Sequence, residues 1–237
     1  MAPQDTVTAL VIRPPGPRAA WTDARRVDAI AGQARPPGSV LETSDLRDGV
    51  RRAAATGARW IWLLDAAVVP RRDALGELLR FEQDPRGLPA PLILASKVLD
   101  AAGALHEASL PQHEFRRREF ALRACGQRVM ALRAARTGSV LVRTDVIARF
   151  GLPRRGLSAG WSVFDWTARI LRGPAEVGYL VPGSVAQIDG LPRPPAGGYG
   201  SRLIILAGPA WAPQDRRREA YQLVADLTGA LRRAPRA

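Results

Sequence analysis

An apolar run that ends on a single acid is the stretch of this chain best suited to chemistry. Residues 58–64 have the length and composition of a buried strand, Asp65 follows them, and Pro70 precedes a helix-like segment. This order predicts a strand that delivers a carboxylate to the carboxyl edge of a sheet, where open α/β sheets bind ligands. Two roles stay open for Asp65: a ligand to a bound group, or an acid that caps a turn or helix at the strand end.

Other reactive residue types are sparse. The two histidines, His106 and His113, are too few and too poorly spaced for a histidine-based metal site. Cys125 is the only cysteine, which excludes an internal disulfide and a cysteine metal cluster, and it has no histidine near it in the sequence. The fingerprints of nucleophile elbows, phosphate loops and dinucleotide-binding turns are absent, so hydrolase, P-loop and dehydrogenase functions receive little support.

Composition points to a folded protein with an affinity for anions. The 237 residues suffice for one large α/β domain, and 46% hydrophobic and 24% charged residues are typical of a globular chain. The net charge of +13 comes almost wholly from arginine, since Lys97 is the only lysine. A solvated basic surface is the somewhat favoured interpretation of this bias, and the alternatives are nucleotide diphosphates, acidic lipids or nucleic acid as partners. Basic residues are not interleaved with aromatic ones, which argues against nucleic acid.

The elements that must position Asp65 alternate along the chain. Strand-like segments cover residues 6–12, 39–43, 59–64, 91–98, 127–132, 137–143 and 176–181. Helix-like segments cover residues 19–34, 46–56, 72–81 and 163–171, and a short helix capped by Thr144 and Asp145 ends at Phe150. A connection rich in proline and glycine over 182–200 and an amphipathic helix over 215–232 complete the chain. This alternation predicts an α/β fold with a doubly wound, mostly parallel sheet flanked by helices.

Four stretches in this order resemble the GT-A fold of family-2 glycosyltransferases, especially their rhamnosyl- and galactofuranosyl-transferase-like branch. They are residues 60–75, with the strand, the Asp-x-Asp position and the next helix; residues 97–105, after the following strand; residues 137–152; and residues 162–169, where the family carries an acidic cluster on a helix that ends in arginine. The resemblance covers roughly residues 58–206. It implies a glycosyltransferase domain over residues 1–206, with residues 207–237 as a C-terminal helical extension.

The chain departs from this family where the family binds metal and activates its acceptor. Asp65 matches the first acid of Asp-x-Asp, which helps to hold the nucleotide, but Ala67 stands in place of the last, which ligates a divalent metal. A methyl group cannot coordinate Mg²⁺ or Mn²⁺, so a metal cofactor is doubtful and none is assigned. Ser162 and Val163 replace the paired acids, one of which serves the family as base, and no histidine follows the last strand. The segment between residues 43 and 60 is also too short for the usual nucleotide loop.

The resemblance nevertheless assigns candidate roles to five residues. Asp65 and Arg169 are predicted to bind a nucleotide-sugar donor, and Asp165, at the third acidic position, is the candidate base for an acceptor hydroxyl. An ordinary surface ion pair between Asp165 and Arg169, four residues apart, is the favoured alternative. Trp161 and His106 are predicted to contact the acceptor, whereas Trp166 is expected in the core because it shares a helix face with Ile170.

Two functions therefore follow from the sequence, and neither is decided by it. The first is a family-2-like, inverting glycosyltransferase that transfers a sugar from a nucleotide sugar to a polysaccharide or cell-envelope acceptor, with its arginines neutralising the phosphates. The second is a catalytically inactive pseudo-glycosyltransferase that serves as a binding or assembly module. No stretch approaches the ~20 apolar residues of a membrane helix, so we expect a cytoplasmic protein. The basic C-terminal helix is expected either to pack on its own domain or to dock on the inner face of the membrane or on a protein partner.

Overall fold

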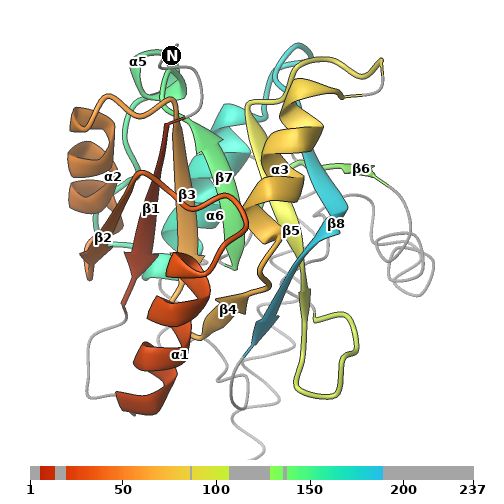
Figure 1. Cartoon of the computed structure of the whole chain (residues 1–237). Coiled ribbons are helices and arrows are strands. Elements are labelled where there is room, and N and C mark those ends of the chain that lie inside the picture. Colours follow the sequence, from red (N-terminus) through yellow and green to blue (C-terminus); the bar gives the residue numbers. More distant parts are fainter. Residues whose placement is uncertain (1–5, 14–19, 86, 107–128, 136–137, 189–237) are drawn as a thin grey trace, which may run out of the picture.

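The computed structural model describes residues 6–13, 20–85, 87–106, 129–135 and 138–188. An eight-stranded sheet lies at its centre, with helices on both sides (Figure 1). The strands are β1 (Val7–Ile12), β2 (Ser39–Thr43), β3 (Trp60–Asp65), β4 (Val68–Pro70), β5 (Ile93–Leu99), β6 (Met130–Ala131), β7 (Ser139–Arg143) and β8 (Gly178–Ile188). The helices are α1 (Ala20–Ala31), α2 (Leu46–Ala55), α3 (Ala74–Gln83), α5 (Val146–Phe150) and α6 (Ala159–Ile170).

The strand order is β2-β1-β3-β7-β5-β8-β4, and β6 pairs with β8 beside this path. β1 is parallel to both β2 and β3, and β5 is parallel to β8. β7 runs antiparallel between β3 and β5, and β4 and β6 run antiparallel to β8. The predicted α/β class and mostly parallel sheet are thus confirmed, and β3, the strand that carries Asp65, is central.

Two apolar cores hold the helices against this sheet because the strands are buried on both faces. Ile61 and Leu63 of β3 pack with Val50 of α2 and Trp166 of α6 on one face, which we call the α6 face. The alternate residues of β3 pack on the other face, the α3 face, together with residues of α3; the set includes Trp60, Trp62, Leu64, Leu75 and Leu78. Trp60, Trp62 and Trp166 are fully enclosed, so each removes a large apolar area from water. Trp166 is therefore a core residue, as predicted.

A chain of buried hydroxyl groups crosses the α3 face and ties four strands to α3. Trp62 Nε1 donates to Ser139 Oγ (2.9 Å), and Ser184 Oγ donates to the carbonyl of Ala74 (2.8 Å). Ser96 lies between the two serines, with Oγ–Oγ distances of 2.6 Å to Ser139 and 2.7 Å to Ser184. Since each hydroxyl has one proton, Ser139 must donate to Ser96 and Ser96 to Ser184. All four donors are satisfied, which is what burial of polar groups requires.

Most predicted elements are observed, but three differ. β8 continues to Ile188, whereas the prediction ended this strand at residue 181 and treated residues 182–200 as a connection. It continues because its partners on β5 shift from Ser96↔Val181 to Lys97↔Val185, so Pro182 and Gly183 fall in an irregularity that leaves the pairing intact. β4 was not predicted, and α6 begins at Ala159, four residues earlier than expected.

Several expectations fall outside the described residues: Cys125, His113, the C-terminal helix, and the division into residues 1–206 and 207–237. Within the described ranges, every helix is too short or too polar to traverse a bilayer.

Candidate functional site

The carboxyl ends of three neighbouring strands meet at the lower edge of the sheet in Figure 1. Ile12, the last residue of β1, is in register with Thr43 at the end of β2 and with Asp65 at the end of β3. Asp65 therefore lies in the middle of the sheet at its carboxyl edge, the place predicted from the sequence. Its side chain is half-buried.

Asp65 stabilises the turn that follows it. Its carboxylate Oδ1 accepts a hydrogen bond from the N–H of Ala67 (2.8 Å), and its own N–H donates to the carbonyl of Gly138 (2.9 Å). The guanidinium of Arg26, fully buried, donates to the carbonyl of Ala66 (2.8 Å). The turn-capping role that the sequence left open is thus observed. A carboxylate has several acceptor positions, and the Ala67 contact occupies one of them.

A cluster of charges beside this turn was missed from the sequence. The carboxylate of Glu42, near the end of β2, lies 2.7 Å from Nη2 of Arg13 and 3.7 Å from Nη2 of Arg26. Arg52 donates to the carbonyl of Glu42 (2.8 Å). Arg13 directly follows the strand predicted at residues 6–12, and Glu42 lies near the end of the next. The logic that located Asp65 applies equally to these two residues.

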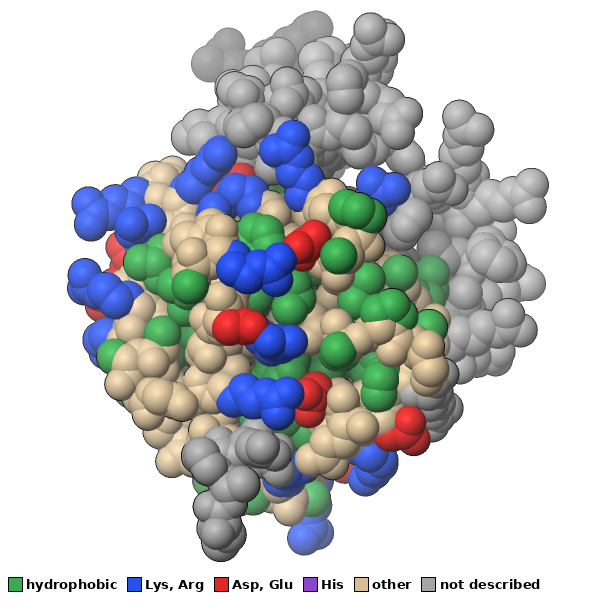
Figure 2. Space-filling model, turned by 90° about the horizontal axis from the view of Figure 1, so that it is seen from above, with side chains coloured by type: hydrophobic (Ala, Val, Ile, Leu, Met, Phe, Trp, Pro, Cys, Tyr) green, Lys and Arg blue, Asp and Glu red, His purple; other side chains and the backbone are tan. Residues whose placement is uncertain are grey.

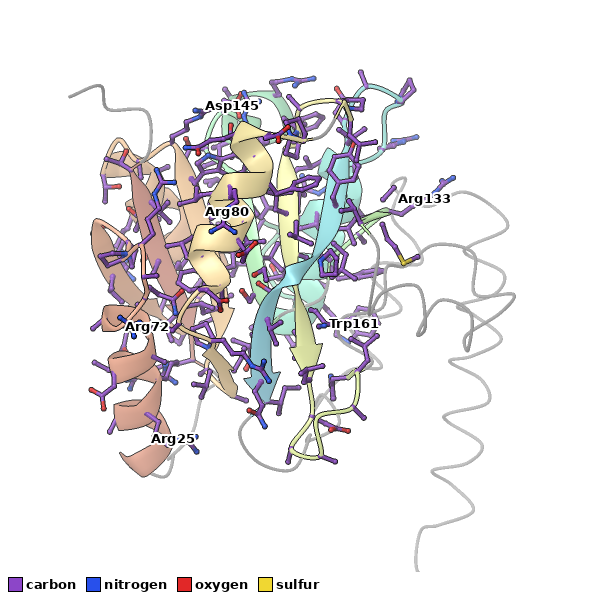
Figure 3. The ribbon with its side chains drawn as sticks, turned by 45° about the vertical axis from the view of Figure 1, so that its right-hand side comes forward. Arg25, Arg72, Arg80, Arg133, Asp145 and Trp161 are labelled. Carbon is purple, nitrogen blue, oxygen red and sulfur yellow. The ribbon has the colours of Figure 1, made fainter. Side chains whose placement is uncertain are left out.

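The opposite edge of the sheet also carries arginines, but they are paired. Figure 2 views this end of the molecule and shows basic and acidic side chains next to one another across the face. The pairs include Arg59 with Glu82 (2.6 Å), Arg149 with Glu176 (2.5 Å) and Arg143 with Asp145. Asp145, labelled at the top of Figure 3, marks this edge. Much of the positive charge there is neutralised locally, so the net charge of the chain does not by itself locate an anion site.

Asp165 and Arg169 form an ion pair, as their spacing predicted, but the pair is not on the surface. Asp165 Oδ2 lies 3.1 Å from Nε of Arg169, and its Oδ1 lies 3.6 Å from Nη1 of Arg154. The side chain of Asp165 is 1% exposed. Arg169 also donates to the carbonyls of Phe150 (2.8 Å) and Leu152 (3.0 Å), so the pair holds α6 to the segment that follows α5.

This arrangement bears directly on the predicted roles of both residues. A general base must reach the hydroxyl from which it takes a proton. Asp165 is enclosed and faces two guanidinium groups, while Arg169 is directed at Asp165 and at two backbone carbonyls. Ser162 and Val163, at the positions of the family's paired acids, are buried as well. The base role of Asp165 and the donor-binding role of Arg169 stay predictions.

The two predicted acceptor residues lie in different surroundings. Trp161, at the start of α6, is 8% exposed and packs edge-on against Phe164, with ring centroids 5.6 Å apart. Figure 3 shows it far below Asp145, toward the carboxyl edge. His106 follows a turn after β5, and its N–H donates to the carbonyl of Val98 (2.8 Å). His106 is thus at the carboxyl edge and half-buried; contact of either residue with an acceptor stays a prediction.

Comparison with known proteins identifies the fold. No protein-family model and no curated protein sequence matches the chain. Among solved structures, S. aureus TarS 1–349 in complex with UDP-GlcNAc matches with a TM-score of 0.55 at 8% identity, over 92% of this chain and 71% of that chain. GalNAc-T7 with UDP, GalNAc and Mn²⁺ matches with a TM-score of 0.52 at 13% identity, over 79% of this chain and 44% of that chain. The fold is that of a GT-A-like glycosyltransferase.

At these identities the likeness establishes the fold alone. The chain spans less than half of the GalNAc-T7 chain and 64% of a second TarS 1–349 structure. The rhamnosyl- and galactofuranosyl-transferase-like branch stays a prediction, and activity has to be argued from the site.

The described residues at the carboxyl edge do not suit a divalent metal ion. Ala67 offers a methyl group where a metal ligand would be needed, and Mg²⁺ and Mn²⁺ require oxygen donors. In the part of the chain that the structure describes, no three His, Cys, Asp or Glu residues gather closely enough to hold a metal. At the turn itself, the guanidinium of Arg26 donates to the carbonyl of Ala66.

Proposed function

We propose that this GT-A-like protein binds a nucleotide sugar at the carboxyl edge of β1 and β3 without a divalent metal. The observation that carries the proposal is the position of Asp65, at the end of the central strand, in register with the ends of β1 and β2. A ligand at this edge would meet the carboxylates of Asp65 and Glu42 and the guanidinium of Arg13. Carboxylates accept hydrogen bonds from sugar hydroxyls, and cations attract phosphates.

The fold supports this class of ligand. Among the matching structures, TarS was solved with UDP-GlcNAc, and GalNAc-T7 was solved with UDP, GalNAc and Mn²⁺. Open α/β sheets in general bind ligands at the carboxyl ends of their strands. The net charge of +13 adds a general attraction for a nucleotide diphosphate.

The described residues support the binding of a nucleotide sugar more strongly than they support the transfer of its sugar. Transfer to a hydroxyl acceptor benefits from a base within hydrogen-bond reach, and the only acid retained from the family's cluster, Asp165, is enclosed by Arg169 and Arg154. We therefore favour the pseudo-glycosyltransferase function, in which the chain binds a nucleotide sugar as a recognition or assembly module in the cytoplasm. A membrane or protein partner for its basic C-terminal helix remains part of this proposal.

Calorimetric titration with UDP, UDP-sugars and dTDP-sugars, with Mg²⁺ or with EDTA, tests the binding. We expect at least one nucleotide sugar to bind with the same affinity in both conditions. Asp65→Asn should weaken it about 10-fold, because it replaces a charged acceptor by a neutral one while preserving an oxygen for the Ala67 N–H. Asp145→Asn, at the opposite edge, is the matched control and should bind as the unaltered protein does. Binding that requires metal, or an unaltered affinity in Asp65→Asn, would contradict the proposal.

Active sugar transfer is the second candidate function, and the extent of the alignment with TarS favours it. Nearly all of the chain, 92%, aligns with S. aureus TarS 1–349, which was solved in complex with UDP-GlcNAc. On this view the chain is a metal-independent transferase with a polysaccharide or cell-envelope acceptor. Turnover of a nucleotide sugar in the presence of glycan acceptors, lost in Asp65→Asn, would establish it. If the protein binds a nucleotide sugar but turns over none of the donors tested, active transfer is excluded and the binding-module function is supported.

A further inference from the structure

Lys97, the only lysine of the chain, lies in the same row of the sheet as Asp65. In the antiparallel pair of β3 and β7, Leu64 is opposite Ser139, and the next N–H, that of Asp65, donates to the carbonyl of Gly138 (2.9 Å). In the pair of β5 and β7, Ala95 is opposite Val140. Continuing this register places Ser96 opposite Ser139, in agreement with the 2.6 Å contact of their hydroxyl groups, and places Lys97 level with Gly138. Gly138 thus separates Asp65 from Lys97.

Both side chains leave the sheet on the same face. Leu64 belongs to the core of the α3 face, and the hydroxyl of Ser96 is linked through Ser184 to the start of α3. Successive residues of a strand point to opposite faces, so Asp65 and Lys97 project toward the α6 face. The preceding alternate residues, Leu63 and Ala95, are indeed part of the core on that side.

The strand registers set the separation of these two residues. Neighbouring strands lie about 4.8 Å apart, so the Cα atoms of Asp65 and Lys97, two strands apart, are separated by about 10 Å. Gly138, between them, has no side chain of its own. A carboxylate and an ammonium group therefore flank a glycine at the carboxyl edge.

Lys97 is also available to a ligand. Arg13 is paired with Glu42, and Arg26 is buried against Glu42 and the carbonyl of Ala66. Lys97, by contrast, is half-buried, and within the described ranges no acidic group pairs with it. A partly enclosed ammonium ion without a counter-charge attracts an anion more strongly than an exposed, paired guanidinium does.

We propose that the ammonium group of Lys97 binds the diphosphate of the donor, in the role that a divalent cation would otherwise have. This inference rests on the proposed nucleotide-sugar binding and specifies how that site neutralises phosphate charge. Asp65 would face the nucleoside end of the ligand, and Lys97 its phosphates. No electron or proton transfer is involved, because the ammonium ion acts only as a positive charge and hydrogen-bond donor.

The test compares uridine, UMP, UDP and a UDP-sugar in titrations of Lys97→Gln, Lys97→Arg and the unaltered protein, all with EDTA. Lys97→Gln should weaken UDP and UDP-sugar binding about 10-fold, the usual effect of losing a hydrogen bond to a charged group, and should leave uridine unaffected. Lys97→Arg should retain most of the affinity. Arg133→Gln removes a solvent-exposed charge from a position that Figure 3 shows away from the carboxyl edge, and should change nothing.

The outcomes separate this inference from the function on which it rests. If the unaltered protein binds UDP and Lys97→Gln binds it equally well, Lys97 is not the diphosphate ligand, although the proposed function stands. If Lys97→Gln weakens uridine and UDP alike, its effect is not specific to phosphate, and the inference is again wrong. If no nucleotide binds to the unaltered protein, both this inference and the proposed function are wrong. Thermal unfolding of each variant, expected to match the unaltered protein, shows that the fold is intact.

Discussion

Replacing Asp165 by asparagine separates its structural role from a catalytic one. The substitution keeps the size of the side chain but removes the negative charge that faces Arg169 at 3.1 Å and Arg154 at 3.6 Å. Breaking a buried ion pair by removing one partner typically costs about 3–5 kcal/mol, because a charge is left without compensation. Arg169 is 19% exposed and keeps its bonds to two carbonyls, so we expect the lower value, about 3 kcal/mol.

Urea unfolding followed by tryptophan fluorescence measures this loss, since Trp161 and Trp166 belong to the same helix. For a chain of this length, a loss of about 3 kcal/mol corresponds to a melting temperature about 6–12 °C lower. Asp145→Asn is the control: its partner Arg143 is also an arginine, but Asp145 is 48% exposed, and surface pairs contribute about 1 kcal/mol or less. An Asp165→Asn variant as stable as the unaltered protein would refute the structural role of this ion pair.

Two further predictions concern stability. Gly49→Ala should destabilise the fold by about 1–3 kcal/mol in urea unfolding, since a Cβ there would lie 2.5 Å from Thr43 Cγ2. At Gly76, in α3, a Cβ would have no neighbouring atom closer than 4.0 Å, so Gly76→Ala should instead stabilise the fold by up to about 1 kcal/mol. If both substitutions changed the free energy of unfolding equally, crowding of the new Cβ would not be the cause. Burial raises the pKa of Tyr179 above 10.0, so the folded state holds the phenolic proton more tightly than the unfolded state does. The free energy of unfolding should therefore be unaffected by this group below pH 10 and should decrease as the pH rises through the raised pKa. Tyr179→Phe should abolish that decrease in unfolding measured between about pH 8 and 11, and a decrease of the same size in the variant would assign it to another group.

The elements that local signals determine were predicted well. The short strand β2 was predicted with its observed bounds, because a glycine precedes it and an N-cap acid, Asp45, follows it. Asp45 accepts a hydrogen bond from the N–H of Asp48, the contact expected of such a cap. β8 was predicted too short because proline and glycine usually end a strand. Pairing with β5 on one side and β4 on the other overrides that signal, and such pairing cannot be seen in a local window.

The candidate site was predicted in part for the same reason. Asp65 could be located because a single strand and its end suffice to place it. Lys97 could not, since its position relative to Asp65 depends on two strand registers that join residues far apart in the sequence. The pairing of Asp165 with Arg169 followed from helical spacing, but its burial did not. It is buried because Arg154 and the carbonyls of Phe150 and Leu152, all outside α6, approach the pair.

Contacts within the chain hold the turn that contains Ala66 and Ala67. In the family that the sequence resembles, a divalent metal is ligated at this turn and supplies positive charge. Here the Ala67 N–H bond to Asp65 and the buried guanidinium of Arg26 fix the turn without an ion. Arg26 is fully buried, so its guanidinium is enclosed by the chain. The turn therefore needs no metal for its structure, and under the proposal above the charge of a bound diphosphate is neutralised by Lys97. Addition of EDTA should consequently alter neither the melting temperature nor the affinity for UDP, and a loss of both would show that a metal is bound after all.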